Sequence, residues 1–389
     1  MKAQEKRTRQ LPRSRKARTG KRSRAQSRGA RASRPTLARR LLGWLAVVGL
    51  AVLSAAGALL GWSHLPQGAK DEPFPFLVRE RDPGLLVQAL EEQGLVSPKW
   101  LMSAYIRVFS PLSSAQERLH LLRRGLSPRQ VLARLIESDN RPTVQVTLPE
   151  GWNHLQIAAR LEARGICSGL AFQAAVFEPS LLRSLDIDGP SAEGYLFPAR
   201  YPFRVDDDPT SVVARMVSEA RARLEKLGPP SHADLQKLGF GQKELIILAS
   251  IVEKETGSRS ERPRVARVFL NRLLQPRAST VGRLQSDPTA VYGCQVDPLL
   301  SPACRQFSGK VTPALLEDAR NPYNTYKHAG LPPGPISNPG ELAIGAVLAP
   351  AASQELFFVA DGQGGHTFSL TFAEHRRAVK RLQRIRAGR

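Results

Sequence analysis

The sequence predicts a mixed α+β protein with one N-terminal transmembrane helix, a small α/β module and a larger α+β domain. Three observations lead to this prediction. An uncharged apolar run lies near the N-terminus, helix-start signals alternate with short strand-like segments, and 42% of the residues are hydrophobic. At 389 residues, the chain is long enough for two or three modules.

The N-terminal segment 1–40 is strongly basic. It contains 16 Lys and Arg and one acid, Glu5, so much of the net charge of +23 is local. With little apolar surface to bury, we expect this tail to be disordered. Setting membrane topology or contacting anionic lipid explains its charge better than binding nucleic acid, because no nucleic-acid fold accompanies it.

The run 41–62 has 22 residues without a charge. That length crosses a hydrocarbon core of about 30 Å, and Trp44 and Trp62 lie near its ends, where indoles favour the interface. A cleaved signal peptide is the alternative, but such apolar regions are usually shorter. The positive-inside rule predicts a single-pass protein of the cell inner (cytoplasmic) membrane, with a cytoplasmic N-terminus and the remainder in the periplasm or otherwise outside the cytoplasm.

After a tether at 63–73, a compact module is expected over 74–140. Asp82-Pro83 and Ser97-Pro98 are helix starts, and Ser127 with Gln130 forms a capping box for a third helix. With strand-like segments near 76–80 and 118–122, the predicted order is strand, helix, helix, strand, helix. This order alone indicates no chemistry.

The larger domain is expected over 143–386. VQVTL alternates like a strand, Asn153 with Gln156 is a capping box, and helices are predicted over 210–227 and 242–256. LFFVA and HTFSL, joined by a Gly-rich turn, indicate a β-hairpin, and Thr371 with Glu374 caps a basic C-terminal helix. Polar clusters at 191–201, 284–293, 321–340 and 364–369 are interpreted as loops, and long structured loops are often functional.

The three cysteines suggest one candidate disulfide. Cys294 and Cys304 flank a short Pro-containing loop that an oxidising compartment would allow them to close, although the spacing leaves free thiols equally open. Cys167 is expected to be a small buried residue. There is no CxxC or HExxH motif, so we expect neither a metal nor another cofactor.

ASIVEKETG places Glu253 and Glu255 at the end of an apolar helix. At 100° per residue they point in nearly opposite directions and do not form a pair on one face. The negative end of the helix dipole and apolar neighbours would raise the pKa of Glu253, which suits a general acid. A solvated helix end with ordinary Glu–Lys pairing is the alternative.

Several long motifs occur in one order. They are VTLPEGWNHLQIA (146–158), EGYLFPARYPF (193–203), IVEKETG (251–257), VARVFLNRL (265–273), LQSDPTAVYG (284–293), NTYKHAGLPPGPISNPG (324–340) and FFVADG with GGHTFSLTFAEH (357–375). Together they resemble the endolytic murein transglycosylase family, the YceG-like proteins. The resemblance covers about 74–386 and is strongest over 143–375.

The resemblance implies a LysM-like small module and a lyase that cleaves the β-1,4 bond between N-acetylmuramic acid and N-acetylglucosamine in nascent peptidoglycan. The muramic acid 6-hydroxyl attacks its own anomeric carbon and leaves a 1,6-anhydro end, so one carboxyl serves first as acid and then as base. Glu253 matches the catalytic acid. The residues that match the substrate groove are Glu193, Gln285, Ser286, Asp287, Tyr292, Asn324, Tyr326 and His366.

Other assignments stay open. Glu193 is as compatible with bracing a loop as with positioning substrate, and His375 is interpreted as structural. The first module lacks the family's tyrosine near 118–122, which puts its glycan binding in doubt.

The implied partners are glycan strands, membrane lipid around 41–62 and peptidoglycan synthases. The alternative function is a peptidoglycan-binding scaffold without activity. A third interpretation, a pyridoxal phosphate-dependent lyase acting on aminodeoxychorismate, conflicts with the predicted export.

Overall fold

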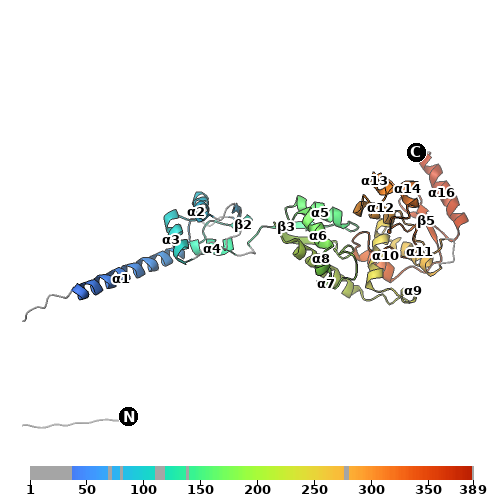
Figure 1. Ribbon diagram of the computed structural model, residues 1–389. Coiled ribbons are helices and arrows are strands. Elements are labelled where there is room, and N and C mark those ends of the chain that lie inside the picture. Colours follow the sequence, from blue (N-terminus) through green and yellow to red (C-terminus); the bar gives the residue numbers. More distant parts are fainter. Residues whose placement is uncertain are drawn as a thin grey trace, which may run out of the picture. The chain divides into compact units, whose positions relative to one another are not determined.

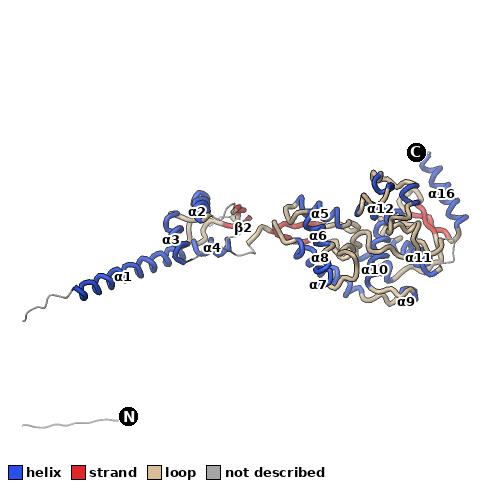
Figure 2. The backbone as a smooth tube through the Cα atoms, in the orientation of Figure 1, coloured by secondary structure: helices blue, strands red, loops and turns tan. Residues whose placement is uncertain are grey.

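A computed structural model of the chain describes residues 37–68, 72–78, 82–109, 119–136, 140–275 and 280–387 (Figures 1 and 2). The predicted disordered tail therefore lies outside the described residues up to position 36. The described residues divide into two units between Gly61 and Trp62. The fold is mixed α+β, as predicted, with three separate two-stranded sheets among the described residues.

The N-terminal apolar run forms one long helix, α1 (Leu37–Ser63) (Figure 1). It begins four residues before the predicted run and includes Arg39 and Arg40. Its 27 residues span about 40 Å at 1.5 Å per residue. The helix is therefore long and apolar enough to cross a membrane.

The small module has the predicted order of elements. Asp82 caps its first helix by accepting the N–H groups of Gly84 and Leu85 at 2.8 and 3.0 Å. The two strands pair antiparallel, with Phe74 opposite Leu122. In chain order, the elements are β1 (Phe74–Leu77), α2 (Pro83–Glu92), α3 (Lys99–Phe109), β2 (Leu119–Leu122) and α4 (Pro128–Ile136).

The larger part of the chain combines a predominantly helical core with two small antiparallel sheets, β3 with β4 and β5 with β6 (Figure 2). Its elements are β3 (Thr143–Thr147), α5 (His154–Ala163), α6 (Gly169–Val176), α7 (Pro179–Ser184), β4 (Arg200–Arg204), α8 (Pro209–Leu227), α9 (Ala233–Lys237), α10 (Gln242–Glu255), α11 (Arg262–Leu274), α12 (Asp287–Val296), α13 (Pro302–Arg305), α14 (Pro313–Glu317), α15 (Glu341–Leu348), β5 (Phe357–Ala360), β6 (His366–Ser369) and α16 (Phe372–Ala387). The predicted hairpin is confirmed, since β5 and β6 pair antiparallel.

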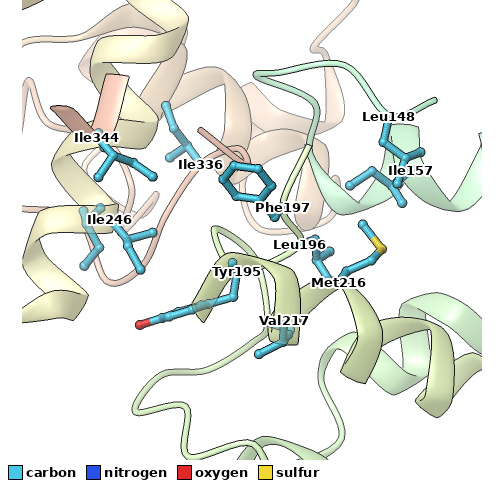
Figure 3. Close-up of a cluster of buried hydrophobic side chains, with 14 of the residues drawn as sticks. Leu148, Ile157, Tyr195, Leu196, Phe197, Met216, Val217, Ile246, Ile336 and Ile344 are labelled. Carbon is cyan, nitrogen blue, oxygen red and sulfur yellow. The ribbon is translucent and has the colours of Figure 1, made fainter. Parts of the chain in front are cut away.

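Helix α10 is the central element of the core. All its residues from Leu245 to Val252 are buried, because the run LIILASIV is apolar on every face and packs against α11, α12 and α15. Its one hydroxyl, Ser250, donates to the Ile247 carbonyl at 2.7 Å and accepts the N–H of Ile336 at 3.0 Å. Figure 3 shows Ile246 of this helix with Ile336 and Ile344 in the core. This packing fixes the C-terminal end of α10, where the two candidate acids lie.

Two segments that were interpreted as loops end in regular structure, although 191–199 itself contains no helix or strand. Segment 191–201 runs into β4, which pairs antiparallel with β3, and segment 284–293 enters α12. Ser286 occupies the N-cap position of α12 and Pro288 lies in its first turn, which is a recognised helix start. The loop interpretation of 284–293 was therefore wrong after the first three residues.

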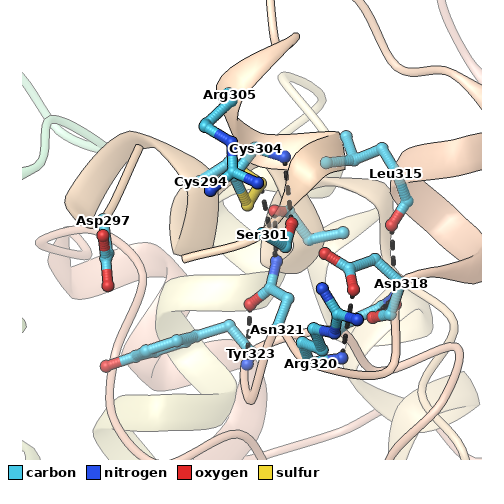
Figure 4. Close-up of a disulfide and its surroundings, with 12 residues drawn as sticks. Cys294, Asp297, Ser301, Cys304, Arg305, Leu315, Asp318, Arg320, Asn321 and Tyr323 are labelled. Atoms are coloured by element: carbon cyan, nitrogen blue, oxygen red, sulfur yellow. Dashed lines mark hydrogen bonds between the residues drawn. A yellow bond between two sulfur atoms is a disulfide. The ribbon is translucent and has the colours of Figure 1, made fainter. Parts of the chain in front are cut away.

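Cys294 of α12 and Cys304 of α13 form a disulfide, which settles the pairing that the spacing left open (Figure 4). The two residues belong to a small buried cluster with Ala290 and Leu315. Asn321 lies beside it and donates from Nδ2 to the Ala290 carbonyl at 2.8 Å. The disulfide thereby ties the end of α12 to the segment that carries the 321–340 loop.

Candidate active site

A cavity of about 480 Å³ lies at the C-terminal end of α10. Its walls come from the start of α12, the loop after Asn324, the β5–β6 hairpin and α16. A cavity of this size falls within the range of small-ligand sites. It brings together four of the residues predicted from the sequence, Gln285, Asp287, Tyr326 and His366. A fifth predicted residue, Ser286, forms a hydrogen bond with Glu255, which also lines the cavity.

Glu255, the last residue of α10, lines this cavity. The Ser286 hydroxyl donates a hydrogen bond to its carboxylate. Burial raises the pKa of Glu255 to about 7, the Ser286 bond opposes this shift, and the negative charge of Asp287 adds to it. Arg272 and His366 oppose it as well. A large fraction of Glu255 is therefore protonated near neutral pH, which is the property that a general acid needs.

Asp287 and Tyr326 form a bonded pair in the wall of the cavity. The Tyr326 hydroxyl donates to Asp287 Oδ1 at 2.7 Å. Burial and this bond raise the pKa of Tyr326 far above its ordinary value, so the phenol keeps its proton. The pair therefore presents a carboxylate oriented by a neighbouring hydroxyl.

Arg272 of α11 brings a buried cation to the same cavity, and sequence reasoning had not selected it. Its Nε donates to the Leu356 carbonyl at 2.7 Å, and its guanidinium lies 5.7 and 5.9 Å from the ring centroids of Phe357 and Phe358. Burial lowers the pKa of Arg272 to about 10, so it stays charged at neutral pH. Arg272 belongs to the VARVFLNRL motif, but the motif alone does not indicate which way its side chain points.

His366 lines the cavity at the start of β6. Glu261 holds it through two contacts, accepting the backbone N–H at 2.9 Å and lying 2.7 Å from Nδ1. A carboxylate at that position favours the tautomer that carries the Nδ1 proton. His375 also lines the cavity and stacks on Phe357 at 5.3 Å. Burial lowers the pKa of His375, so it is neutral at pH 7.

Glu253 lies in a different environment. Its side chain is 5% exposed, Arg262 Nη2 donates to Oε1 at 2.6 Å, and the Gly340 N–H donates to Oε2 at 3.1 Å. Burial raises the pKa of Glu253, whereas the Gly340 N–H and the Arg262 charge oppose that shift. Glu253 is not among the described residues that line the cavity. It is thus the buried ion-pair partner of Arg262.

Three further residues predicted to bind substrate are buried: Glu193, Tyr292 and Asn324. Glu193 has no exposed surface and accepts from Asn338 Nδ2 at 2.6 Å, from the His154 N–H at 3.0 Å and from the Tyr292 hydroxyl at 3.2 Å. Asn324, also fully buried, accepts the Tyr326 N–H at 3.0 Å and donates to three carbonyls between Leu315 and Asp318. Glu193 and Asn324 therefore brace the loops, and Asn324 holds Tyr326 in place.

A second cavity of about 450 Å³ meets the first at Asp287, which lines both. Tyr292 lies in its wall, on the side of α12 opposite the disulfide cluster. The two cavities place binding surface on both sides of Asp287. Such an arrangement suits an extended ligand.

A protonatable carboxyl, a hydroxyl donor and a second carboxylate around one cavity define the class of site: one built for acid–base chemistry on a polar ligand. A family model described as the YceG-like family matches residues 79–381. This match covers most of the chain, and the protein belongs to the YceG-like family.

Two curated relatives have the name endolytic murein transglycosylase. The protein of Bacillus subtilis (strain 168) is 26% identical over 311 residues, which cover 76% of this chain and 81% of the relative. The protein of Streptococcus pneumoniae serotype 2 (strain D39) is 27% identical over 304 residues, and the match covers 72% of this chain but 52% of the longer relative. A crystal structure of a YceG-like protein from Listeria monocytogenes has a TM-score of 0.50 at 26% identity, over 79% of this chain and 99% of that one.

Proposed function

We propose that this protein is a membrane-anchored endolytic lytic transglycosylase. It cleaves the β-1,4 bond between N-acetylmuramic acid and N-acetylglucosamine within peptidoglycan strands and leaves 1,6-anhydro ends. Family membership and the activity named for the two relatives support the reaction class. The observation that carries the proposal is the Glu255 carboxyl in the cavity, with its pKa raised to about 7 by burial.

We assign the acid to Glu255 in place of Glu253. Protonated Glu255 donates its proton to the leaving oxygen as the glycosidic bond breaks. The carboxylate then accepts the proton of the muramic acid 6-hydroxyl, whose oxygen bonds to C1 and closes the anhydro ring. One carboxyl performs both transfers, so the second carboxylate of a hydrolase is not needed. Glu253 cannot take this role without leaving its bonds to Arg262 and Gly340.

The neighbouring residues have supporting roles. Ser286 orients the acid through its hydrogen bond, and the Asp287 charge raises the pKa of Glu255 further. The oxocarbenium-like transition state of glycoside cleavage is positive, so an ionised Asp287 also stabilises it. Tyr326 fixes Asp287, while Gln285 and His366 offer hydrogen bonds to sugar hydroxyls. Three buried residues contribute indirectly, by holding these groups in position: Glu193, Tyr292 and Asn324.

We further propose that α1 anchors the protein in the cell inner membrane, with the basic segment 1–40 cytoplasmic and the rest outside the cytoplasm. The length and composition of α1 and the charge of the segment before it support this orientation. The anchor would confine the enzyme to nascent strands near the membrane, where it terminates elongation beside the synthases. The order of elements over 74–140 supports a LysM-like module, and 143–386 forms the catalytic domain.

The test is digestion of uncrosslinked glycan strands by the full chain in detergent, with products identified by mass spectrometry. Internal fragments with 1,6-anhydro-muramic acid ends, absent for Glu255→Gln, would establish the activity and its acid. Reducing ends would show a hydrolase. Intact strands that remain bound to folded wild-type protein would favour the scaffold function instead.

A further inference from the structure

The second cavity, next to the proposed reaction site, has different chemistry. It is formed by the β3–α5 connection, α10 and α12, and it shares Asp287 with the first cavity. Aliphatic groups of Leu155, Val291 and Ile336 form part of its wall. A ligand bound in the first cavity therefore has apolar surface directly beyond Asp287.

Polar groups of two kinds complete the wall. Gln156 and Gln295 are exposed, and their Oε1 atoms accept from the Asn153 N–H at 3.1 Å and from Asn153 Nδ2 at 3.2 Å, while their NH2 groups can donate to the carbonyls of a peptide backbone. Lys254 is also exposed, and its Nζ donates to the Gly151 carbonyl at 3.1 Å. An ammonium group has three donors, so Lys254 can bind an anionic ligand while this bond persists.

The aromatic content of the two cavities also differs. The first contains the half-buried rings of Phe358 and Tyr326, and flat apolar ring faces suit the apolar side of a sugar. Among the described residues that line the second cavity, Tyr292 is the aromatic one. It is 3% exposed and its hydroxyl bonds Glu193 at 3.2 Å, so it offers little ring surface. The second cavity is therefore poorly suited to stacking against a sugar ring.

We infer that the second cavity binds the acidic, alanine-rich stem peptide of the muramic acid whose sugar ring occupies the first cavity. Alanine methyl groups fit the aliphatic wall, backbone amides fit the glutamines, and a peptide carboxylate pairs with Lys254. The inference rests on the proposed function for its substrate. It adds a preference for strands that still carry their peptides.

The test measures binding without turnover, in the full chain with Glu255→Gln as the parent protein. Uncrosslinked strands with intact stem peptides are compared with the same strands after an amidase has removed the peptides. Lys254→Gln removes the cation, and Val311→Trp adds bulk at the cavity rim, where Val311 is 42% exposed. Lys380→Gln is the matched control, because this exposed lysine of α16 lines neither cavity. Unchanged melting temperatures establish that each variant folds.

We expect the parent to bind peptide-bearing strands more tightly than denuded ones. Lys254→Gln should weaken the peptide-bearing complex about fivefold, the effect of one partly exposed ion pair. Val311→Trp should weaken it more, and both should leave binding of denuded strands unchanged. Equal affinity of the parent for both strands, or equal weakening of both by either variant, would overturn the inference. Since no cleavage is involved, inactivity of the wild-type protein would reject the proposed function and leave this result standing.

Discussion

Replacing each of the two candidate acids by glutamine should separate catalysis from stability. The substitution removes a charge and a titrating proton while it preserves shape. For Glu255→Gln we expect a loss of about 10²–10⁴ in cleavage rate, the usual contribution of a general acid. Stability should not fall, because burial already disfavours the charged carboxylate that the substitution removes.

Glu253→Gln should show the opposite behaviour. The Glu253–Arg262 pair is buried, with side chains 5% and 6% exposed, so removing the anion leaves a guanidinium without its nearest counter-charge. Losing one partner of a buried pair costs about 3–5 kcal/mol. We expect the lower end, since Glu150 lies 3.6 Å from Arg262 Nη1 and the glutamine oxygen can still accept a hydrogen bond. The melting temperature should drop by roughly 10 °C.

Two assays on the same purified proteins decide between these outcomes. Thermal unfolding gives the stability of each variant, and mass spectrometry of digested strands gives the rate of anhydro-end formation at a temperature where both remain folded. The reasoning is refuted if Glu253→Gln is fully stable but inert while Glu255→Gln still cleaves. That result would restore the acid to Glu253. If both variants lose activity, the Glu253–Arg262 ion pair positions the end of α10 for catalysis.

Four further predictions follow from the same structure. Cleavage should fall about tenfold per pH unit above pH 7, because Glu255, whose pKa is raised from 4.5 to about 7, must be protonated to act as acid. The same raised pKa should make the folded state lose stability as the pH rises from about 4.5 through 7, a dependence that Glu255→Gln abolishes in pH-dependent melts. The Cys294→Ser, Cys304→Ser double variant should lose about 2–3 kcal/mol in denaturant unfolding, the loop-closure value for a separation of 10 residues; an unchanged midpoint would contradict this. Glu193→Gln should destabilise the fold by about 2–3 kcal/mol, because both carboxylate oxygens accept from buried donors, Asn338 Nδ2 and the His154 N–H among them, and an amide NH2 in place of either oxygen leaves its donor unpaired; normal stability with weakened strand binding would instead make Glu193 a substrate contact.

Local signals explain why much of the fold could be predicted. The helix start at Asp82 and the capping box at Asn153 each satisfy free N–H groups of a first turn, and both bonds are present in the structure. The hairpin of β5 and β6 was visible as two apolar runs around a Gly-rich turn. These features depend on residues a few positions apart, so the sequence alone contains them.

Strand β4 could not be predicted by the same means. Pro202 lies in its middle, and a proline within a run argues against a central strand because it lacks an N–H donor. The structure accommodates it because the sheet has two strands, so β4 has a free edge and pairs with β3 alone. Whether a strand has a second neighbour is decided by segments far away in the chain.

The choice between Glu253 and Glu255 depended on the same kind of distant information. The helix dipole acts on both carboxylates at the end of α10, and two residues of separation show only that they face in nearly opposite directions. The side that faces a cavity is set by the packing of α12 and the β5–β6 hairpin, which places Ser286 and His366 around Glu255. The other side meets Arg262, which begins α11, and Gly340 ahead of α15. Burial raises the pKa of both carboxyls, and groups that favour the anion lie near each of them, Arg262 at Glu253 and Arg272 at Glu255. The difference is that Glu253 is paired directly with Arg262, whereas Glu255 faces the cavity. Direct pairing and access to the cavity, and not position in the helix, therefore distinguish an ion-pair partner from a proton donor.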